Sequence, residues 1–154
     1  NYVEKAKKLN PLADENIPGC GSSGALGFCC LTFLNAKLMP GAEFILRKTR
    51  LEEYIKNSDL VITGEGCLDG QTVMGKAPIG VARFAKKYKK PVIAFSGCVK
   101  DGAQACNEYG IDAYFPILRS IVSYEEAMDK QNAAISLQRT CEQVFRLIKM
   151  KIAD

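Results

Sequence analysis

Three short apolar runs alternate with helical stretches in the middle of the chain. The runs cover residues 60–63, 91–97 and 113–117, and each is rich in β-branched or aromatic side chains. Such runs predict buried strands. The intervening residues 77–87 and 101–109 have the pattern of helices. Strands separated by helices of about 10–15 residues predict right-handed βαβ crossovers, so we expect an α/β fold with a parallel sheet and flanking helices.

The first third of the chain is less regular. Residues 10–25 are rich in Pro, Gly and Ser and predict a loop, whereas residues 26–38 carry apolar side chains at helical spacing. The Pro40-Gly41 pair is expected to break the chain, and a helix is predicted over residues 49–57. Residues 1–8 lack an initiator Met and resemble the end of a helix, which suggests a piece of a longer protein.

The C-terminal region predicts a longer helical region. Ser123 and Glu126 have the spacing of a capping box, in which each residue bonds the other's backbone N–H. The last helix carries one apolar stripe, which consists of Ala134, Leu137, Cys141, Val144, Phe145, Ile148 and Ile152. The stripe marks the side of that helix expected to face the protein interior.

Composition narrows the class of protein. Of the 154 residues, 47% are apolar and 25% are charged, which is ordinary for a globular protein. The net charge is only +4, and basic residues alternate with acids, as in residues 47–53, so we do not expect nucleic-acid binding. No run of about 20 apolar residues and no signal-peptide pattern is present, so we expect a cytoplasmic protein that does not enter a membrane.

The residues available for chemistry are limited, because the chain has no histidine. Mechanisms that use a histidine base or a histidine-bound zinc are therefore excluded. There are seven cysteines, at positions 20, 29, 30, 67, 98, 106 and 141, and no two have the C-x-x-C spacing of metal or redox motifs. We expect them to be small buried apolar side chains in a reducing compartment.

A polar, glycine-rich segment over residues 63–75 follows the first predicted strand. Its polar members are Thr63, Glu65, Asp69, Gln71 and Thr72, and its glycines are Gly64, Gly66, Gly70 and Gly75. Ligands of open parallel sheets bind at this end of the strands. Glycines allow positive φ and close approach of the backbone to a ligand, and free N–H groups there would favour an anion.

Lys76 directly follows this segment, just before the first turn of the predicted helix. The positive end of a helix dipole disfavours a cation by roughly 0.3–1 kcal/mol. An anion such as phosphate beside the lysine would explain its position. Two simpler interpretations stay open, namely that Lys76 points into water and that the glycines only shape a turn.

Known phosphate motifs do not match this segment. Residues 70–76 come near a P-loop, but Ala77 stands where the magnesium-binding hydroxyl belongs. The Gly64-Glu65-Gly66 triplet does not continue as a dinucleotide-binding fingerprint. Motif reasoning therefore stops at anion binding.

A longer set of residues resembles the bacterial glycerate kinase family. The matching segments are Asp59-Leu60-Val61-Ile62-Thr63-Gly64-Glu65-Gly66, then Asp69, Gln71-Thr72, Gly75-Lys76, Pro78 and Gly80-Val81-Ala82, with Asn10-Pro11-Leu12-Ala13, Gly21-Ser22-Ser23-Gly24-Ala25-Leu26-Gly27 and Leu38-Met39-Pro40-Gly41 upstream. These matches extend from Asn10 to about Arg146, and several are rare combinations. Two features depart from the family: Cys67 replaces a usual basic residue, and family members are more than twice as long.

The resemblance implies two domains with the site in the cleft between them. Residues 1–50 would close an inserted α/β domain, and residues 51–154 would form the C-terminal half of a flavodoxin-like domain. The missing N-terminal segment of the same enzyme, with its Asp-Ser-Phe-Lys stretch, would complete the site. Homo-oligomer formation is left open.

The resemblance also implies transfer of the γ-phosphoryl group of ATP to glycerate, with Mg²⁺ and with 2-phosphoglycerate as the expected product. We expect Asp69 to be the catalytic base, Glu65 to bind magnesium or orient the substrate, and Lys76 to neutralise phosphate. The remaining residues expected to bind substrate or phosphate are Gln71, Thr72, Gly64, Gly66 and Gly75, with Gly21, Ser22, Ser23 and Gly24 from across the cleft.

Other functions stay open at this stage. The chain can be a catalytically silent fragment that acts as an anion-binding or interaction module, and the absent N-terminal segment and Cys67 motivate that alternative. A flavodoxin-like FMN or response-regulator domain is disfavoured, because the chain has no tryptophan for flavin stacking and no acidic cluster at the first strand end.

Overall fold

The structure, a computed structural model, describes residues 2–150. Its elements are α1 (Tyr2–Leu9), α2 (Ser22–Leu34), α3 (Gly41–Lys48), α4 (Leu51–Lys56), β1 (Val61–Leu68), the 3₁₀ turn η1 (Thr72–Met74), α5 (Ala77–Lys87), β2 (Val92–Val99), α6 (Ala105–Glu108), β3 (Ala113–Pro116), α7 (Tyr124–Met128) and α8 (Lys130–Lys149). The described chain forms two compact units that divide between Phe44 and Ile45. The domain boundary expected near residue 50 stays a prediction.

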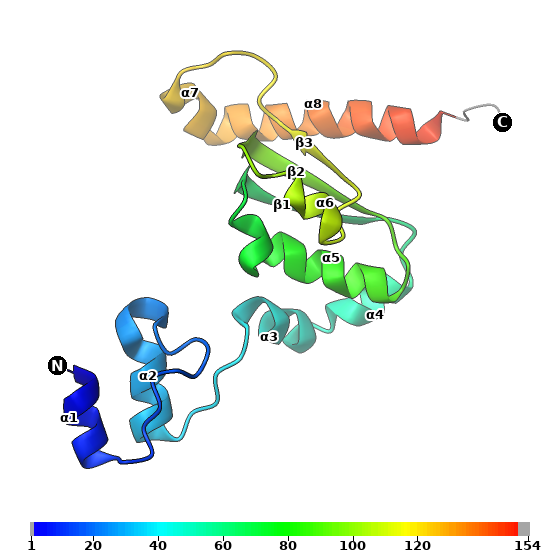
Figure 1. Ribbon diagram of the computed structural model, residues 1–154. Coiled ribbons are helices and arrows are strands. Elements are labelled where there is room, and N and C mark those ends of the chain that lie inside the picture. Colours follow the sequence, from blue (N-terminus) through cyan, green and yellow to red (C-terminus); the bar gives the residue numbers. More distant parts are fainter. Residues whose placement is uncertain (1, 151–154) are drawn as a thin grey trace. The chain divides into compact units, whose positions relative to one another are not determined.

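The second unit is built on a parallel sheet in the order β1-β2-β3, as Figure 1 shows. Val61 pairs with Val92, and Ile93 pairs with Ala113, both in parallel register. The helix α5 lies between β1 and β2 in sequence, and α6 lies between β2 and β3. The α/β class and the parallel sheet predicted from the sequence are therefore confirmed.

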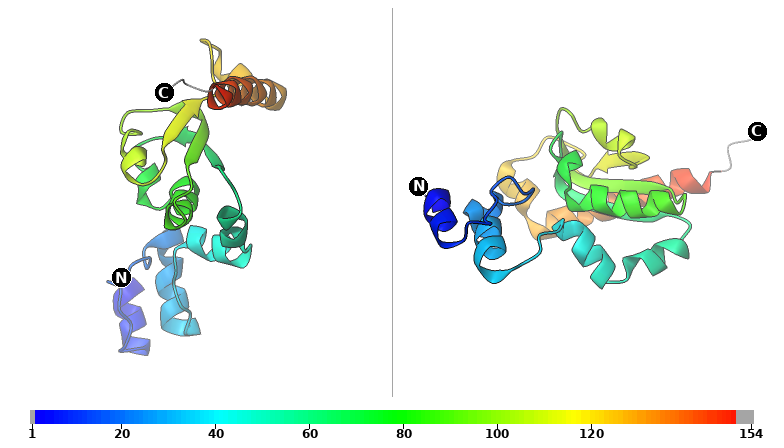
Figure 2. Two further views of the ribbon diagram at one scale, coloured as in Figure 1. Left: turned by 90° about the vertical axis from the view of Figure 1, so that its right-hand side faces the viewer. Right: turned by 60° about the horizontal axis from the view of Figure 1, so that its bottom comes forward.

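Helices cover both faces of this sheet. On one face, the fully buried Ile79 and Ala82 of α5 share a core with Val92 and Ala94 of β2. On the other face, Val144 of α8 packs in a smaller core with Ile93 and Phe95. These two β2 residues alternate with Val92 and Ala94, so their side chains point to the opposite face of the sheet. The two faces of β2 are both apolar because the strand is central, which is the pattern of a parallel strand covered on both sides. Figure 2 shows α5 and α8 on opposite sides of the sheet.

The strand β1 is longer than the sequence indicated, and this changes the role of its glycines. Residues 64–66 were expected in a loop, but they continue β1 to Leu68. A Cβ atom on Gly64 would collide with the backbone carbonyl of Phe95, so this glycine lets two strands approach each other. Within the glycine-rich segment, Gly75 has the positive φ, at 103°. Close strand contact therefore explains Gly64, and a left-handed turn explains Gly75.

Three helical predictions are wrong at their boundaries. The helix expected over residues 101–109 is the single turn α6, although Gly110 ends it with the expected positive φ of 104°. The Pro40-Gly41 pair, expected to break the chain, stands at the start of α3, a helix that was not predicted, and the Phe44 N–H donates to the Pro40 carbonyl over 3.0 Å. The predicted helix 49–57 is the shorter α4.

The C-terminal helices agree more closely with the sequence. The capping box is present, with the Glu126 N–H donating to Ser123 Oγ and the Ser123 N–H donating to the Glu126 carboxylate. On α8, Val144 is buried, whereas Leu137 and Ile148 stay more than a third exposed. The stripe is therefore only partly covered, and its last member, Ile152, lies outside the described residues. No helix between residues 2 and 150 is both long and apolar enough to cross a membrane.

The first unit contains α1, α2, the loop that joins them and the chain that follows α2 as far as Phe44. Its core contains Ala6, Ala13, Cys20 and Phe28. The glycine-rich stretch 21–25 was expected in a loop, and it forms the start of α2 in an irregular conformation. Ser23, Gly24 and Ala25 all have positive φ, so the regular helix begins after them.

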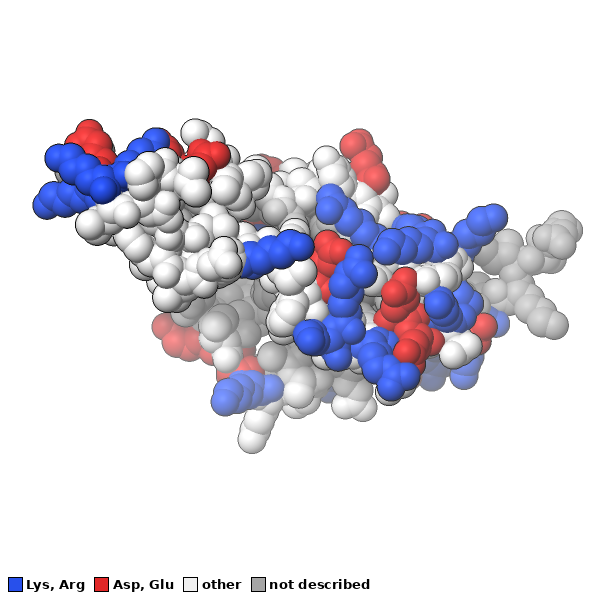
Figure 3. Space-filling view, turned by 90° about the horizontal axis from the view of Figure 1, so that it is seen from below, with Lys and Arg blue, Asp and Glu red and all other residues white. Residues whose placement is uncertain are grey.

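Charged side chains of both signs share the surface shown in Figure 3. Arg50 pairs with Glu53 at 2.8 Å, and Lys86 pairs with Asp112 at 2.5 Å. Exposed pairs of this kind contribute about 1 kcal/mol or less each. The modest positive charge of the chain is thus mixed with acids on this face, as it is in the sequence.

Candidate functional site

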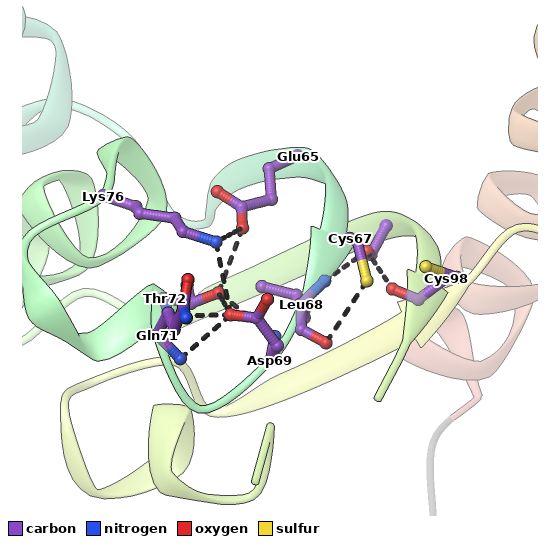
Figure 4. A network of polar contacts seen from close by, with 9 residues as sticks. Glu65, Cys67, Leu68, Asp69, Gln71, Thr72, Lys76 and Cys98 are labelled. Carbon is purple, nitrogen blue, oxygen red and sulfur yellow. Dashed lines mark hydrogen bonds and ion pairs between the residues drawn. The ribbon is translucent and has the colours of Figure 1, made fainter. Parts of the chain in front are cut away.

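Four side chains meet where β1 ends, as Figure 4 shows. Glu65 comes from β1, Asp69 from the residue after it, Thr72 from η1 and Lys76 from the N-cap of α5. The Lys76 Nζ atom donates to Glu65 Oε1 over 3.3 Å and to Asp69 Oδ1 over 3.2 Å. The sequence prediction that Asp69 and Lys76 belong to one site is consistent with this contact.

Asp69 organises the turn that follows β1. Its Oδ1 atom accepts the backbone N–H groups of Gln71 at 2.9 Å and of Thr72 at 3.0 Å. This is the Asx-type turn in which a short acidic side chain replaces a backbone acceptor. Every hydrogen bond described on the Asp69 carboxylate ends on Oδ1. The Oδ2 atom is therefore the oxygen left for another partner.

Thr72 contacts both carboxylates and is fully buried. Its hydroxyl is 3.0 Å from Glu65 Oε1 and 3.2 Å from Asp69 Oδ1, and it accepts the Asp69 N–H at 3.2 Å. A hydroxyl has one proton, so it can donate to only one of the two carboxylates at a time. The Thr72 hydroxyl therefore connects the two acids, and the binding of substrate by Thr72 stays a prediction.

The structure gives another reason for a lysine at the start of α5. The unfavourable position of a cation at a helix start was expected to be offset by a phosphate, but two carboxylates of the protein already do so. Two acids and one lysine leave the cluster with a formal charge of −1. The exposed fractions are 38% for the Lys76 side chain, 18% for Glu65 and 26% for Asp69, so a ligand can reach all three.

The ion pair shifts the pKa of both partners. The hydrogen bond from Lys76 is the main cause that holds the pKa of Asp69 below its ordinary 3.8, with help from the Gln71 N–H. The hydrogen bond to Asp69, followed by that to Glu65, raises the pKa of Lys76 above 10.5. Asp69 is therefore ionised and Lys76 protonated throughout the neutral range.

The lowered pKa of Asp69 predicts a pH-dependent stability difference between the wild-type chain and Asp69→Asn. The folded state binds the Asp69 proton more weakly than the unfolded state, so the ionised carboxylate stabilises the fold above its ordinary pKa. We expect urea unfolding at pH 7 to show the wild type as the more stable protein. This advantage should shrink as the pH falls below about 4. A difference that stays constant from pH 7 to pH 3 would contradict the assignment, and Asp101→Asn is the matched control.

The cluster borders a wide pocket of about 810 Å³. Its lining residues are Asp69, Gly70, Gln71, Met74, Lys100 and Asp101. Lys100 and Asp101 were missed in the sequence, although they follow β2 directly. Because β1 and β2 are parallel, the residues after both strands reach the same edge of the sheet, and this rule could have identified them. Lys100 adds a second cation to the site.

The other predicted residues are placed less centrally. The exposed Gln71 lines the pocket and holds Asp69 through its backbone N–H. Gly64 and Gly66 lie within β1, and Gly75 forms the turn before Lys76. Gly21, Ser22, Ser23 and Gly24 belong to the first unit, so their part in the site stays a prediction.

Comparisons with known proteins agree on one family. The model of the glycerate kinase family matches residues 1–149 of this chain. A glycerate kinase of Halalkalibacterium halodurans is 48% identical over 120 residues, which are 78% of this chain and 32% of that protein. A glycerate 2-kinase of Escherichia coli K12 is 43% identical over 127 residues, or 82% of this chain and 33% of the relative.

A solved structure has a similar fold. The crystal structure of a protein assigned as glycerate kinase 2 of Salmonella typhimurium LT2 superimposes with a TM-score of 0.59 at 31% identity. The match covers 92% of this chain and 38% of that protein. The chain thus spans about a third of the length of the curated relatives described above.

Proposed function

This chain belongs to the glycerate kinase family, and we propose that it supplies catalytic side chains to an enzyme that transfers the γ-phosphoryl group of ATP to glycerate. The observation that carries the proposal is the cluster of Glu65, Asp69 and Lys76, joined at 3.2–3.3 Å beside an open pocket. Phosphoryl transfer depends mainly on positioning and on charge stabilisation, which such a cluster can provide.

Asp69 is the proposed catalytic base. Its pKa is lowered, so the carboxylate is unprotonated at neutral pH and has a free site for a proton. The Oδ1 atom is held by the turn, and we propose that Oδ2 accepts the proton of the attacking glycerate hydroxyl. Lys76 keeps Asp69 oriented, and its charge would also favour the incoming phosphoryl group. The product we propose is 2-phosphoglycerate.

The residues present fit a bound Mg²⁺. The cluster has a net negative charge and leaves Glu65 Oε2 and Asp69 Oδ2 as oxygen donors, and Mg²⁺ in kinases is commonly held by one or two carboxylates together with phosphate oxygens. Residues 2–150 contain no group of three or more acidic, cysteine or histidine side chains that could hold a metal ion by themselves. When bound, Mg²⁺ offsets the charge of the phosphate groups.

Lys100 extends the proposal to the substrate. It lines the same pocket as Asp69 and Gln71. Glycerate carries a carboxylate, so a second cation beside Asp69 would suit it. The glycine-rich stretch 21–24 and the rest of a family-length enzyme are the proposed further contributors.

A chimaeric enzyme tests the proposed function. In it, this chain replaces the matching segment of the Halalkalibacterium halodurans glycerate kinase, to which it is 48% identical. We expect glycerate-dependent release of ADP within about tenfold of the parent rate, and a product that phosphorus NMR identifies as 2-phosphoglycerate. The isolated chain, assayed in parallel, is expected to form little or no product.

The alternative is a silent anion-binding module. Cys67, which replaces a basic residue usual in the family, favours it. A chimaera that is folded and monodisperse but forms no phosphoglycerate, while the parent enzyme does, would support this module and reject the kinase assignment. Restored activity in the chimaera with Cys67→Arg alone would identify Cys67 as the reason.

A further inference from the structure

Two cysteines face each other across the strands that carry the site. Cys67 of β1 and Cys98 of β2 are register partners in the parallel sheet. Neighbouring strands lie about 4.7–4.9 Å apart, and disulfides join residues whose Cα atoms are about 4.4–6.8 Å apart. Figure 4 shows both thiol side chains at the same end of the sheet. The backbone separation therefore allows a bond between these two sulfurs.

Both thiols are reduced and half-buried, so a small reagent can reach them. The Cys98 thiol is the main cause of a raised pKa at Cys67, ahead of burial, which accords with the register pairing of the two residues. The charged groups that act on Cys67 besides Cys98 are Lys100, which lowers its pKa, and Asp69, which raises it. The pair thus borders the candidate site.

Hydrogen bonds connect the cysteine pair to the same turn. The Leu68 N–H donates to Ser96 Oγ at 3.0 Å, and the Ser96 hydroxyl donates to the Cys98 carbonyl at 2.5 Å. Cys67 is two residues before Asp69, and Cys98 is two residues before Lys100. Bond formation between Cys67 and Cys98 would therefore act on the backbone that leads to Asp69 and Lys100 of the pocket.

We propose that Cys67 and Cys98 form a reversible disulfide with low-molecular-weight disulfides, and that they are a redox modification site of this protein. One thiolate attacks a disulfide such as oxidised glutathione, forms a mixed disulfide and releases one glutathione. The other cysteine then attacks the protein sulfur and releases the second glutathione. The two protein thiols lose two electrons and two protons, and the reagent is reduced to two thiols.

The bond would tie β1 and β2 together at the edge where the pocket lies. Side chains on adjacent parallel strands leave in the same direction, so the two Cβ atoms start about as far apart as the strands. Disulfides prefer Cβ atoms about 3.5–4.5 Å apart, so the strand ends must draw together. A disulfide that is strained in this way is reduced more easily than an unstrained one. Its effect on catalysis rests on the proposed function, whereas its formation does not.

Mass spectrometry of the folded chain tests the proposal without an activity assay. Trypsin separates the two cysteines, since Cys67 lies in residues 57–76 and Cys98 in residues 90–100, each with no other cysteine. After treatment with oxidised glutathione, we expect these two peptides linked, lighter by two hydrogens, and about tenfold more abundant than any other linked pair. Dithiothreitol should separate them.

Three variants make the result specific. In Cys67→Ser, Cys98 is expected to keep a stable glutathione adduct, and in Cys98→Ser the adduct should remain on Cys67. In Cys30→Ala, a change at a half-buried cysteine of α2, the 57–76/90–100 link should form as in the wild type. Deuterium exchange over residues 69–76 should slow in the bridged wild type and in bridged Cys30→Ala, and should not slow in the two serine variants.

The proposal is overturned if the folded chain accumulates adducts or other cysteine links without the 57–76/90–100 pair. It is equally overturned if that pair forms no more readily than in urea-unfolded chain. Neither outcome depends on whether the chain supports glycerate phosphorylation, so failure of this proposal is distinct from failure of the proposed function.

Discussion

Asp69→Asn in the chimaeric enzyme is expected to lower kcat for glycerate phosphorylation about 100-fold or more, the usual contribution of a general base. The asparagine oxygen can still accept the Gln71 and Thr72 N–H groups that Asp69 Oδ1 accepts at 2.9 and 3.0 Å. The turn is therefore expected to keep its shape while the proton acceptor is lost. Initial rates at saturating ATP and glycerate measure the effect.

The matched control for this experiment is Asp101→Asn. Asp101 lines the same pocket and loses the same charge, but it takes no part in the cluster with Lys76. Its kcat is expected to stay within about threefold of the unsubstituted chimaera. If both variants lose activity equally, the charge of the pocket matters and not the base. If Asp69→Asn keeps normal turnover, Asp69 is not the base.

Leu68→Ala is expected to destabilise the second unit by about 3 kcal/mol, within the range for truncation of a buried leucine. Leu68 is completely buried and belongs to the main core with Ile79 and Val92. Its truncation leaves a cavity in the core at the residue that directly precedes Asp69. Urea unfolding followed by far-ultraviolet circular dichroism measures the loss.

Ile121→Ala is the control for core burial, because Ile121 is a fully exposed apolar residue of comparable size. A surface substitution of this kind is expected to change the unfolding free energy by less than about 0.5 kcal/mol. Equal effects of Leu68→Ala and Ile121→Ala would mean that the core described around β1 and α5 does not hold this end of the strand.

The strands of the second unit could be predicted because each one is marked by a short run of apolar residues in the sequence. The apolar runs at residues 91–97 and 113–117 became β2 and β3, since a strand buried on both faces leaves a continuous apolar signal. The contact of Asp69 with Lys76 was also within reach of sequence reasoning. The two residues lie seven positions apart around one turn, and local geometry decides their distance.

Other features depended on contacts between distant segments and could not be predicted in this way. Glu65 was expected in a loop because glycines surround it, yet Gly64 serves a close approach to Phe95 that only the folded sheet reveals. Lys100 had no motif to mark it and joins the pocket through the parallel pairing of β1 and β2. A proline breaks a helix in its interior but is favoured at its first turn, and the sequence around Pro40 did not show which case applied.

The strand that carries Glu65 is also an outer strand of the sheet. Across residues 2–150, β1 is paired along one side only, with β2, and the peptide groups of every second residue point to its open side. An open edge of this kind is a template for one more strand. Any polypeptide that docks there, from the same protein or another, would place its own side chains next to Glu65, so the acidic cluster lies at a boundary where a neighbour can complete it.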